Sequence, residues 1–128
     1  MQNFVSPKVL IVDDDESLLE ALRDTLESMQ CQVKTAANGR EALALLKLEK
    51  FVLVISDIRM PSMDGISLLA AISQEGLKTP VIMMTGYSDY SDKEIDERNG
   101  VVLLEKPFST DQMRELVERF IYLSAESA

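Results

Sequence analysis

The sequence predicts a single α/β domain built on a five-stranded parallel sheet, and three observations lead to this prediction. Strand-like segments alternate with amphipathic segments along the whole chain. Four of the strand-like segments are continuous apolar runs rich in β-branched residues, as expected for strands buried on both faces of a sheet. The chain has 128 residues, 46% of them hydrophobic, which suffices for one core but not for a second domain. We therefore expect one domain over residues 1–128, with its core from about residue 8 to residue 121.

Local patterns place the individual elements. Leucine and methionine recur at helical spacing in the first helix, where Ser17 and Glu20 match the S-x-x-E capping box. Pro80 marks the start of the fourth strand, and Ser109 with Gln112 offers a cap for the last helix. The expected strands are 8–12, 32–36, 52–56, 80–84 and 101–104, and the expected helices are 16–29, 39–48, 65–74, 90–98 and 110–123.

Alternating strands and helices require right-handed crossovers and a sheet covered by helices on both faces. The expected architecture is therefore a flavodoxin-like (βα)5 three-layer sandwich with strand order 2-1-3-4-5. In such sheets ligands bind beyond the carboxyl ends of the strands. Residues that end or follow different strands should converge on one pocket.

The residues at these strand ends are suited to phosphoryl transfer to a carboxylate. Asp13 and Asp14 follow the first strand, Asp57 the third, Thr85 the fourth and Lys106 the fifth. Asp57 can act as a nucleophile that forms an acyl phosphate. Three carboxylates against one ammonium leave the pocket at −2, so a divalent cation is required, and ligands that are all oxygen favour Mg²⁺. The crowded carboxylates should also raise one another's pKa when no metal is bound.

Each of these residues also has a purely structural interpretation. Asp13, Asp14 and Asp15 can serve as a helix cap, a role that is sufficient to explain Asp15. Asp57 and Thr85 can be turn residues. The occurrence of all the groups at the ends of separate strands favours the functional interpretation.

Residues 57–65, which read D-x-x-M-P-x-M-D-G, and the Lys106-Pro107-Phe108 triplet complete a recognisable set. The chain closely resembles the receiver domain of two-component response regulators, from about Lys8 to Ile121. The resemblance implies a regulatory domain rather than an enzyme: a bacterial-type signalling phosphoprotein that catalyses at most its own phosphorylation and dephosphorylation.

The resemblance assigns a role to each site residue. Asp57 is the phosphoacceptor, and its donor is a sensor histidine kinase or a histidine phosphotransfer protein. Asp13, Asp14, Asp57 and the backbone carbonyl of Arg59 hold Mg²⁺, for which Mn²⁺ can substitute. Thr85 and Lys106 bind the phosphoryl group. The Lys106–Pro107 bond is expected to be cis.

Three positions depart from the family pattern or modify it. Leu103 stands where the family usually has a switch aromatic, so we expect a muted or differently routed change on the face formed by 90–98, 101–104 and 110–123. Arg59 and Tyr87 are long or bulky residues near the phosphoryl site. Because they can block the hydrolytic water, we expect slow dephosphorylation.

Composition limits the partners. The formal net charge of −9 and an isoelectric point near 4.4 oppose direct binding to nucleic acid or anionic membranes. No apolar stretch approaches the length of a membrane span, the start lacks the features of a signal peptide, and the lone Cys31 excludes an internal disulfide, so we expect a cytoplasmic protein. Cys31 is expected to be a small, partly buried apolar residue.

Other interpretations remain open at this stage. An output partner, a covalently linked output domain and a homodimer through the face described above are all compatible with the sequence, as are a free-standing regulator and a fragment of a longer one. A pseudo-receiver that only binds partners is a second possibility. A haloacid-dehalogenase-like phosphatase with Asp13 as nucleophile is a third, whereas the glycine pattern disfavours a dinucleotide or flavin site.

Overall fold

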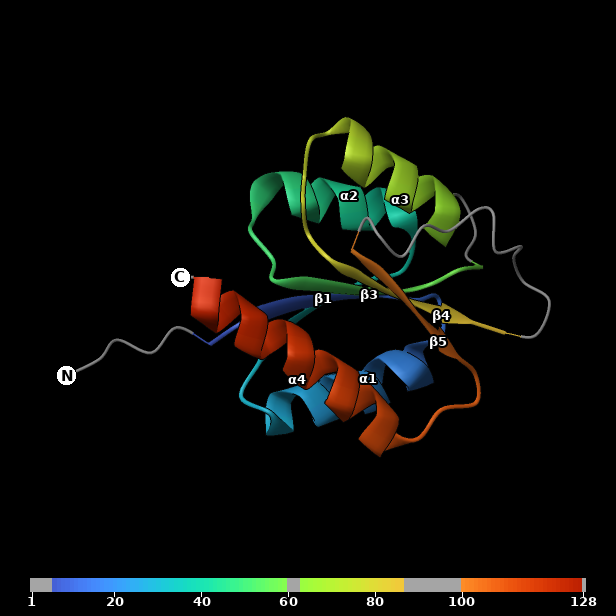
Figure 1. Ribbon diagram of the computed structural model, residues 1–128. Helices are drawn as coiled ribbons and strands as arrows, with labels where there is room; N and C mark the ends of the chain where they lie inside the picture. Colours follow the sequence, from blue (N-terminus) through green and yellow to red (C-terminus); the bar gives the residue numbers. More distant parts are fainter. Residues whose placement is uncertain (1–5, 60–62, 87–99, 128) are drawn as a thin grey trace.

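The computed structural model describes residues 6–59, 63–86 and 100–127, with side chains described as far as residue 121. Within these ranges the chain forms a three-layer sandwich (Figure 1). The predicted helix 90–98 and Tyr87 lie outside the described residues. The elements are β1 (Lys8–Val12), α1 (Glu16–Ser28), β2 (Gln32–Ala36), α2 (Gly39–Leu48), β3 (Leu53–Asp57), α3 (Gly65–Gln74), β4 (Val81–Thr85), β5 (Val101–Glu105) and α4 (Thr110–Ser127).

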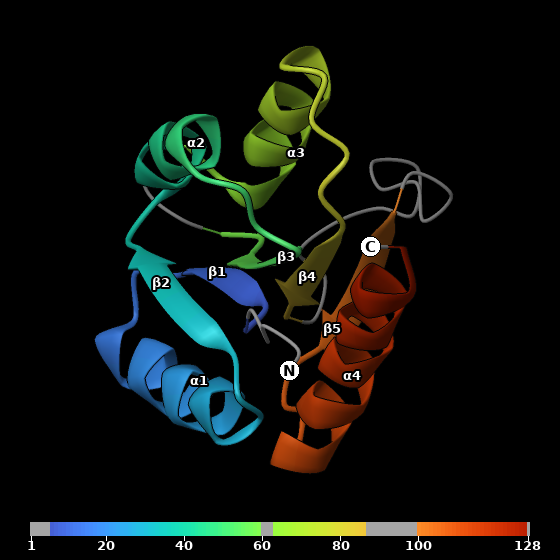
Figure 2. The same ribbon diagram turned by 90° about the vertical axis from the view of Figure 1, so that its left-hand side faces the viewer.

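The five strands are parallel and lie in the order β2-β1-β3-β4-β5, as predicted. Helices α2 and α3 cover one face of the sheet, and α1 and α4 cover the other (Figures 1 and 2). β3 and β4 each begin and end one residue later than predicted. This shift makes Asp57 and Thr85 the last residues of their strands.

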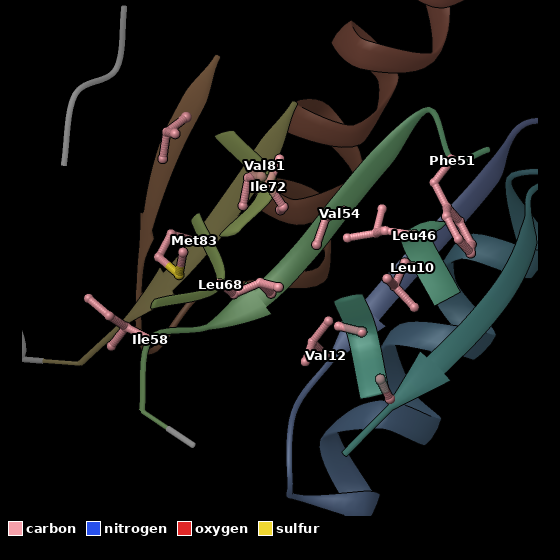
Figure 3. Packing of buried hydrophobic residues seen from close by; sticks show 13 residues of the cluster. Leu10, Val12, Leu46, Phe51, Val54, Ile58, Leu68, Ile72, Val81 and Met83 are labelled. Atoms are coloured by element: carbon pink, nitrogen blue, oxygen red, sulfur yellow. The ribbon is translucent and has the colours of Figure 1, made fainter. Parts of the chain in front are cut away.

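The sheet separates two hydrophobic cores. Along β1, Leu10 and Val12 point to the core under α2 and α3, whereas Val9 and Ile11 point to the core under α1 and α4. Because both faces are covered, the strand reads as an unbroken apolar run. Figure 3 shows the first core, in which aliphatic side chains pack together with Phe51 and Met83.

The helix ends confirm one predicted cap and contradict another. Ser109 and Gln112 form a reciprocal capping box, with the Ser109 N–H donating to Gln112 Oε1 at 2.8 Å and the Gln112 N–H donating to Ser109 Oγ at 3.1 Å. The capping box predicted for Ser17 and Glu20 is wrong. Asp15 caps α1 instead, accepting from the N–H groups of Ser17 and Leu18, because the helix begins two residues earlier than that motif requires.

Cys31 is buried, with 7% of its surface exposed, and burial raises the pKa of its thiol. This agrees with its predicted role as a small apolar residue. Among the described residues, no helix is both long and apolar enough to cross a bilayer.

Candidate phosphoacceptor and metal site

The carboxyl edge of the sheet brings the predicted site residues together. Asp13 directly follows β1, Asp57 ends β3, Thr85 ends β4, and Lys106 directly follows β5. The strands are adjacent in the order β1-β3-β4-β5, so these four residues lie on neighbouring strands although they are spread over more than ninety positions. The topology therefore places these strand-end residues along one edge of the sheet.

Asp57 is 9% exposed, and its Oδ1 accepts a hydrogen bond from the Lys106 ammonium at an Nζ···O distance of 3.2 Å. The backbone also joins the two sides of the pocket, because the Lys106 N–H donates to the Thr85 carbonyl at 2.7 Å. The Lys106–Pro107 peptide bond is cis. Lys106 thus reaches the Asp57 carboxylate while its main chain is fixed to the end of β4.

Asp13 is the most constrained acid of the site. It is 1% exposed, and its Oδ1 accepts from the Asp15 N–H at 2.9 Å. Its Oδ2 is buried, and no hydrogen-bond partner for it exists among the described residues. Burial raises the pKa of Asp13 from 3.8 to about 6; the Asp15 N–H and Lys106 lower it, and the charges of Asp57 and Asp14 raise it. The predicted effect of crowded carboxylates is therefore present, but burial is the larger cause.

Carboxylate oxygens of Asp13, Asp14 and Asp57 all lie within 4.8 Å of one another. A cation at this position would satisfy the unpartnered Oδ2 of Asp13 and offset three negative charges. The donors are all oxygen, which suits a hard divalent cation. This acidic cluster can therefore bind a metal. Arg59 lies two residues after Asp57, and its side chain is exposed.

Thr85 is 1% exposed at the end of β4. Leu103 lies opposite Met83 in the β4–β5 register and packs, half-buried, against the core under α2 and α3. The departure from an aromatic residue therefore places an aliphatic side chain in contact with that core.

The structure adds residues to which the sequence pattern assigns no role. Ser56 is fully buried beside the phosphoacceptor position, and its Oγ donates to the Asp57 carbonyl at 3.0 Å. Gly65 packs directly on the backbone of Asp57, and Gly39 packs on Met63. Only Gly65 lies within the recognised motif. No local pattern distinguishes Gly39 from the glycines of ordinary turns.

Comparison with known proteins places the chain in a family. Residues 9–118 match the model of the response regulator receiver domain. The chain is 40% identical over 114 residues to the DNA-binding transcriptional regulator NtrC of Salmonella typhimurium, covering 88% of this chain and 24% of that protein. It is 33% identical over 129 residues to the alkaline phosphatase synthesis transcriptional regulatory protein PhoP of Bacillus subtilis, covering 97% and 52% respectively.

Among solved structures, the receiver domain of the Francisella response regulator 1452 superimposes with a TM-score of 0.83 at 30% identity, covering 93% of this chain and 99% of that one. The chain therefore belongs to the response regulator receiver domain family. This is a regulatory family, whose members interact with histidine kinases and output domains. The assignment also disfavours the phosphatase alternative with Asp13 as nucleophile.

Proposed function

We propose that Asp57 accepts a phosphoryl group from a sensor histidine kinase or a histidine phosphotransfer protein. An Asp57 carboxylate oxygen attacks the phosphorus, the P–N bond to the donor imidazole breaks, and its electron pair returns to the imidazole nitrogen. The product is an acyl phosphate on Asp57. The observation that carries this proposal is the convergence of Asp57, the acidic cluster and the Lys106 ammonium at one strand edge.

The remaining residues bind and orient the reacting group. Asp13, Asp14, Asp57 and the backbone carbonyl of Arg59 would hold Mg²⁺, or Mn²⁺ in its place. When bound, the metal supplies charge neutralisation for the transferring oxygens. The Lys106 ammonium and the Thr85 hydroxyl would donate hydrogen bonds to the same oxygens. These two groups, at the ends of β5 and β4, would therefore stabilise the negative charge that accumulates there.

The proposed unit is one receiver domain over residues 1–128, with its core at 8–121, acting in the cytoplasm. Its phosphorylated state would alter binding to an output partner or a linked output domain, or to a second copy through the face formed by residues 90–98, β5 and α4. The chain spans 24% and 52% of the two regulators described above, so their outputs do not transfer to it directly.

Intact mass spectrometry with phosphoramidate or acetyl phosphate tests this function. We expect the gain of one phosphoryl group, dependent on Mg²⁺, lost in Asp57→Asn and retained in Asp24→Asn, an exposed acid on α1 that serves as the matched control. Hydroxylamine should remove the group, because it cleaves acyl phosphates. If neither the small donors nor a cognate kinase produces an adduct, the proposal is wrong and a pseudo-receiver becomes the better description.

The proposed slow dephosphorylation depends on Arg59 and Tyr87. Replacing either residue with alanine should shorten the lifetime of the phosphoryl group, measured as the loss of the mass adduct after the donor is removed. An unchanged lifetime in both variants would refute this role.

A further inference from the structure

Two glycines at the carboxyl edge lie so close to their neighbours that no side chain fits. Gly39, the first residue of α2, is one of them. A Cβ built on it would lie 2.7 Å from the carbonyl oxygen and from the Cγ of Met63, closer than real Cβ atoms come to other heavy atoms. The Gly39 N–H also donates to that same carbonyl, at an N···O distance of 3.1 Å. The start of α2 therefore rests on the backbone of Met63.

Gly65, the first residue of α3, makes an equally close contact with the phosphoacceptor strand. A Cβ there would lie 2.7 Å from the Asp57 carbonyl oxygen and from Met83 Sδ, and 2.9 Å from the Cα of Ile58. Its N–H donates to the Ile58 carbonyl at 2.9 Å. Any movement of Gly65 therefore acts directly on the backbone of Asp57.

The two contacts are two residues apart in the sequence. Asp64 lies between Met63 and Gly65, and it caps α3 by accepting from the Ser67 N–H at 2.8 Å. Three consecutive residues thus connect the start of α2 to Asp57, with a backbone contact at each end. Since close-packed groups transmit displacement rather than absorb it, this connection has little room to deform.

The glycines at the opposite edge of the sheet are different. Gly76 and Gly100 have φ values of 73° and 83°, and a Cβ on Gly76 would meet nothing within 4 Å. These residues are glycines because of their backbone conformation and not because of a neighbour. Of these four glycines, the two that close contact requires, Gly39 and Gly65, both lie at the phosphoacceptor edge.

We propose that α2 is coupled to the phosphoacceptor site through Gly39, Met63 and Gly65, with Gly39 acting as a positioning residue for Asp57. The coupling rests on the proposed function of Asp57. It directs the signal to the face covered by α2 and α3, where these two helices lie side by side (Figures 1 and 2). Leu103 packs against the core beneath that face, so this route requires no switch aromatic.

The test compares Gly39→Ala with Gly76→Ala, which should also destabilise the fold but lies at the far end of α3. Mg²⁺ affinity is measured from amide shifts in an NMR titration, and the same spectra report whether each variant is folded. We expect Gly39→Ala to bind Mg²⁺ at least about fivefold more weakly than the unmodified chain, the lower end of ordinary coupling between sites. Gly76→Ala should bind Mg²⁺ with unchanged affinity.

A second measurement needs no variant. Because coupling is reciprocal, saturating Mg²⁺ should slow hydrogen exchange of the Gly39 N–H by a larger factor than that of the Gly76 N–H, which donates to Ser73 and reports global stabilisation. Equal slowing of the two amides would count against the coupling. Normal Mg²⁺ binding by a folded Gly39→Ala variant, or Gly39 exchange that ignores the metal, would overturn the coupling alone. An unmodified chain that binds no Mg²⁺ and takes no phosphoryl group would overturn the coupling together with the proposed function.

Discussion

The two edges of the sheet are built on different principles. The carboxyl edge gathers buried acids, a buried threonine and an ammonium, and one carboxylate oxygen there has no partner among the described residues. At the amino edge the Lys8 ammonium pairs with the Glu49 carboxylate at 2.8 Å and lies 5.6 Å from the Phe51 ring centroid, and both charged side chains are partly exposed. Among the described residues, the buried carboxylates Asp13 and Asp57 both lie at the edge where chemistry is proposed.

The helix ends sharpen this comparison. α1 and α3 both end at the amino edge in a Schellman motif, which has two backbone hydrogen bonds. In α1 the Cys31 N–H donates to the Leu26 carbonyl and the Gln30 N–H to the Glu27 carbonyl. In α3 the Leu77 N–H donates to the Ile72 carbonyl and the Gly76 N–H to the Ser73 carbonyl. α3 has Gly76 at the left-handed position, whereas α1 has Gln30, with a φ of 68°. Gln30 therefore carries a mild conformational cost at the amino edge, and a glycine at this position would remove it.

The largest expected effect is at the carboxyl edge. Gly65→Ala should destabilise the protein by about 3 kcal/mol, the upper part of the range for overpacking, because the obstructing atoms belong to the backbone of Asp57 and Ile58. Urea unfolding of this variant and of Gly76→Ala measures the difference. Gly76→Ala should cost only about 1 kcal/mol, since its penalty is conformational. Equal costs would contradict the distinction between the two edges.

The next effect concerns the buried acid. In the absence of metal at pH 7.5, Asp13→Asn should stabilise the protein by about 2–3 kcal/mol, because it removes an ionised group whose pKa is raised to about 6 by burial. The amide oxygen can keep the bond from the Asp15 N–H. The same variant should lose the stabilisation that Mg²⁺ gives to the unmodified chain.

The sign of the pH dependence follows from the raised pKa of Asp13. Below pH 3.8, the pKa of this group in the unfolded chain, Asp13 is neutral in both the folded and the unfolded state. The stability that neutral Asp13 contributes is lost as the pH rises through about 6, its pKa in the folded state. The advantage of Asp13→Asn should therefore shrink between pH 6 and pH 4. Thermal unfolding of both proteins across this range checks the trend, and an advantage that stays constant with pH would contradict it.

A smaller effect is expected at the end of α1, where a substitution should stabilise the protein, whereas most substitutions destabilise. Gln30→Gly should stabilise the protein by about 0.5–1 kcal/mol, because glycine adopts the left-handed conformation without a Cβ penalty. Gln32→Gly, in the extended backbone of β2, is the matched control and should destabilise. If both variants lose stability, φ at Gln30 is not a source of strain.

The smallest effect is expected for the ion pair at the amino edge. Lys8 lowers the pKa of Glu49, so the pair stabilises the protein above the normal pKa of Glu49 and loses this contribution as the pH falls. Glu49→Gln should therefore reduce stability slightly at neutral pH, and high salt should remove the difference. Unfolding curves at low and high ionic strength provide the comparison.

The sequence by itself determined the alternation of strands and helices, the five-stranded parallel sheet and the residues at its carboxyl edge. These features follow from apolar periodicity and from residue types at strand ends, which are local properties. The last helix cap was equally readable, because Ser109 and Gln112 are three residues apart and bind each other.

Only the tertiary structure decided what each residue at that edge experiences. Asp13, Asp14 and Asp15 read as one acidic run, yet the first is buried with a raised pKa, the second is exposed and the third caps a helix. The demand for glycine at Gly39 and Gly65 depends on atoms supplied by Met63 and Asp57. Burial and close contact are set by groups distant in the chain, so no local pattern can specify them.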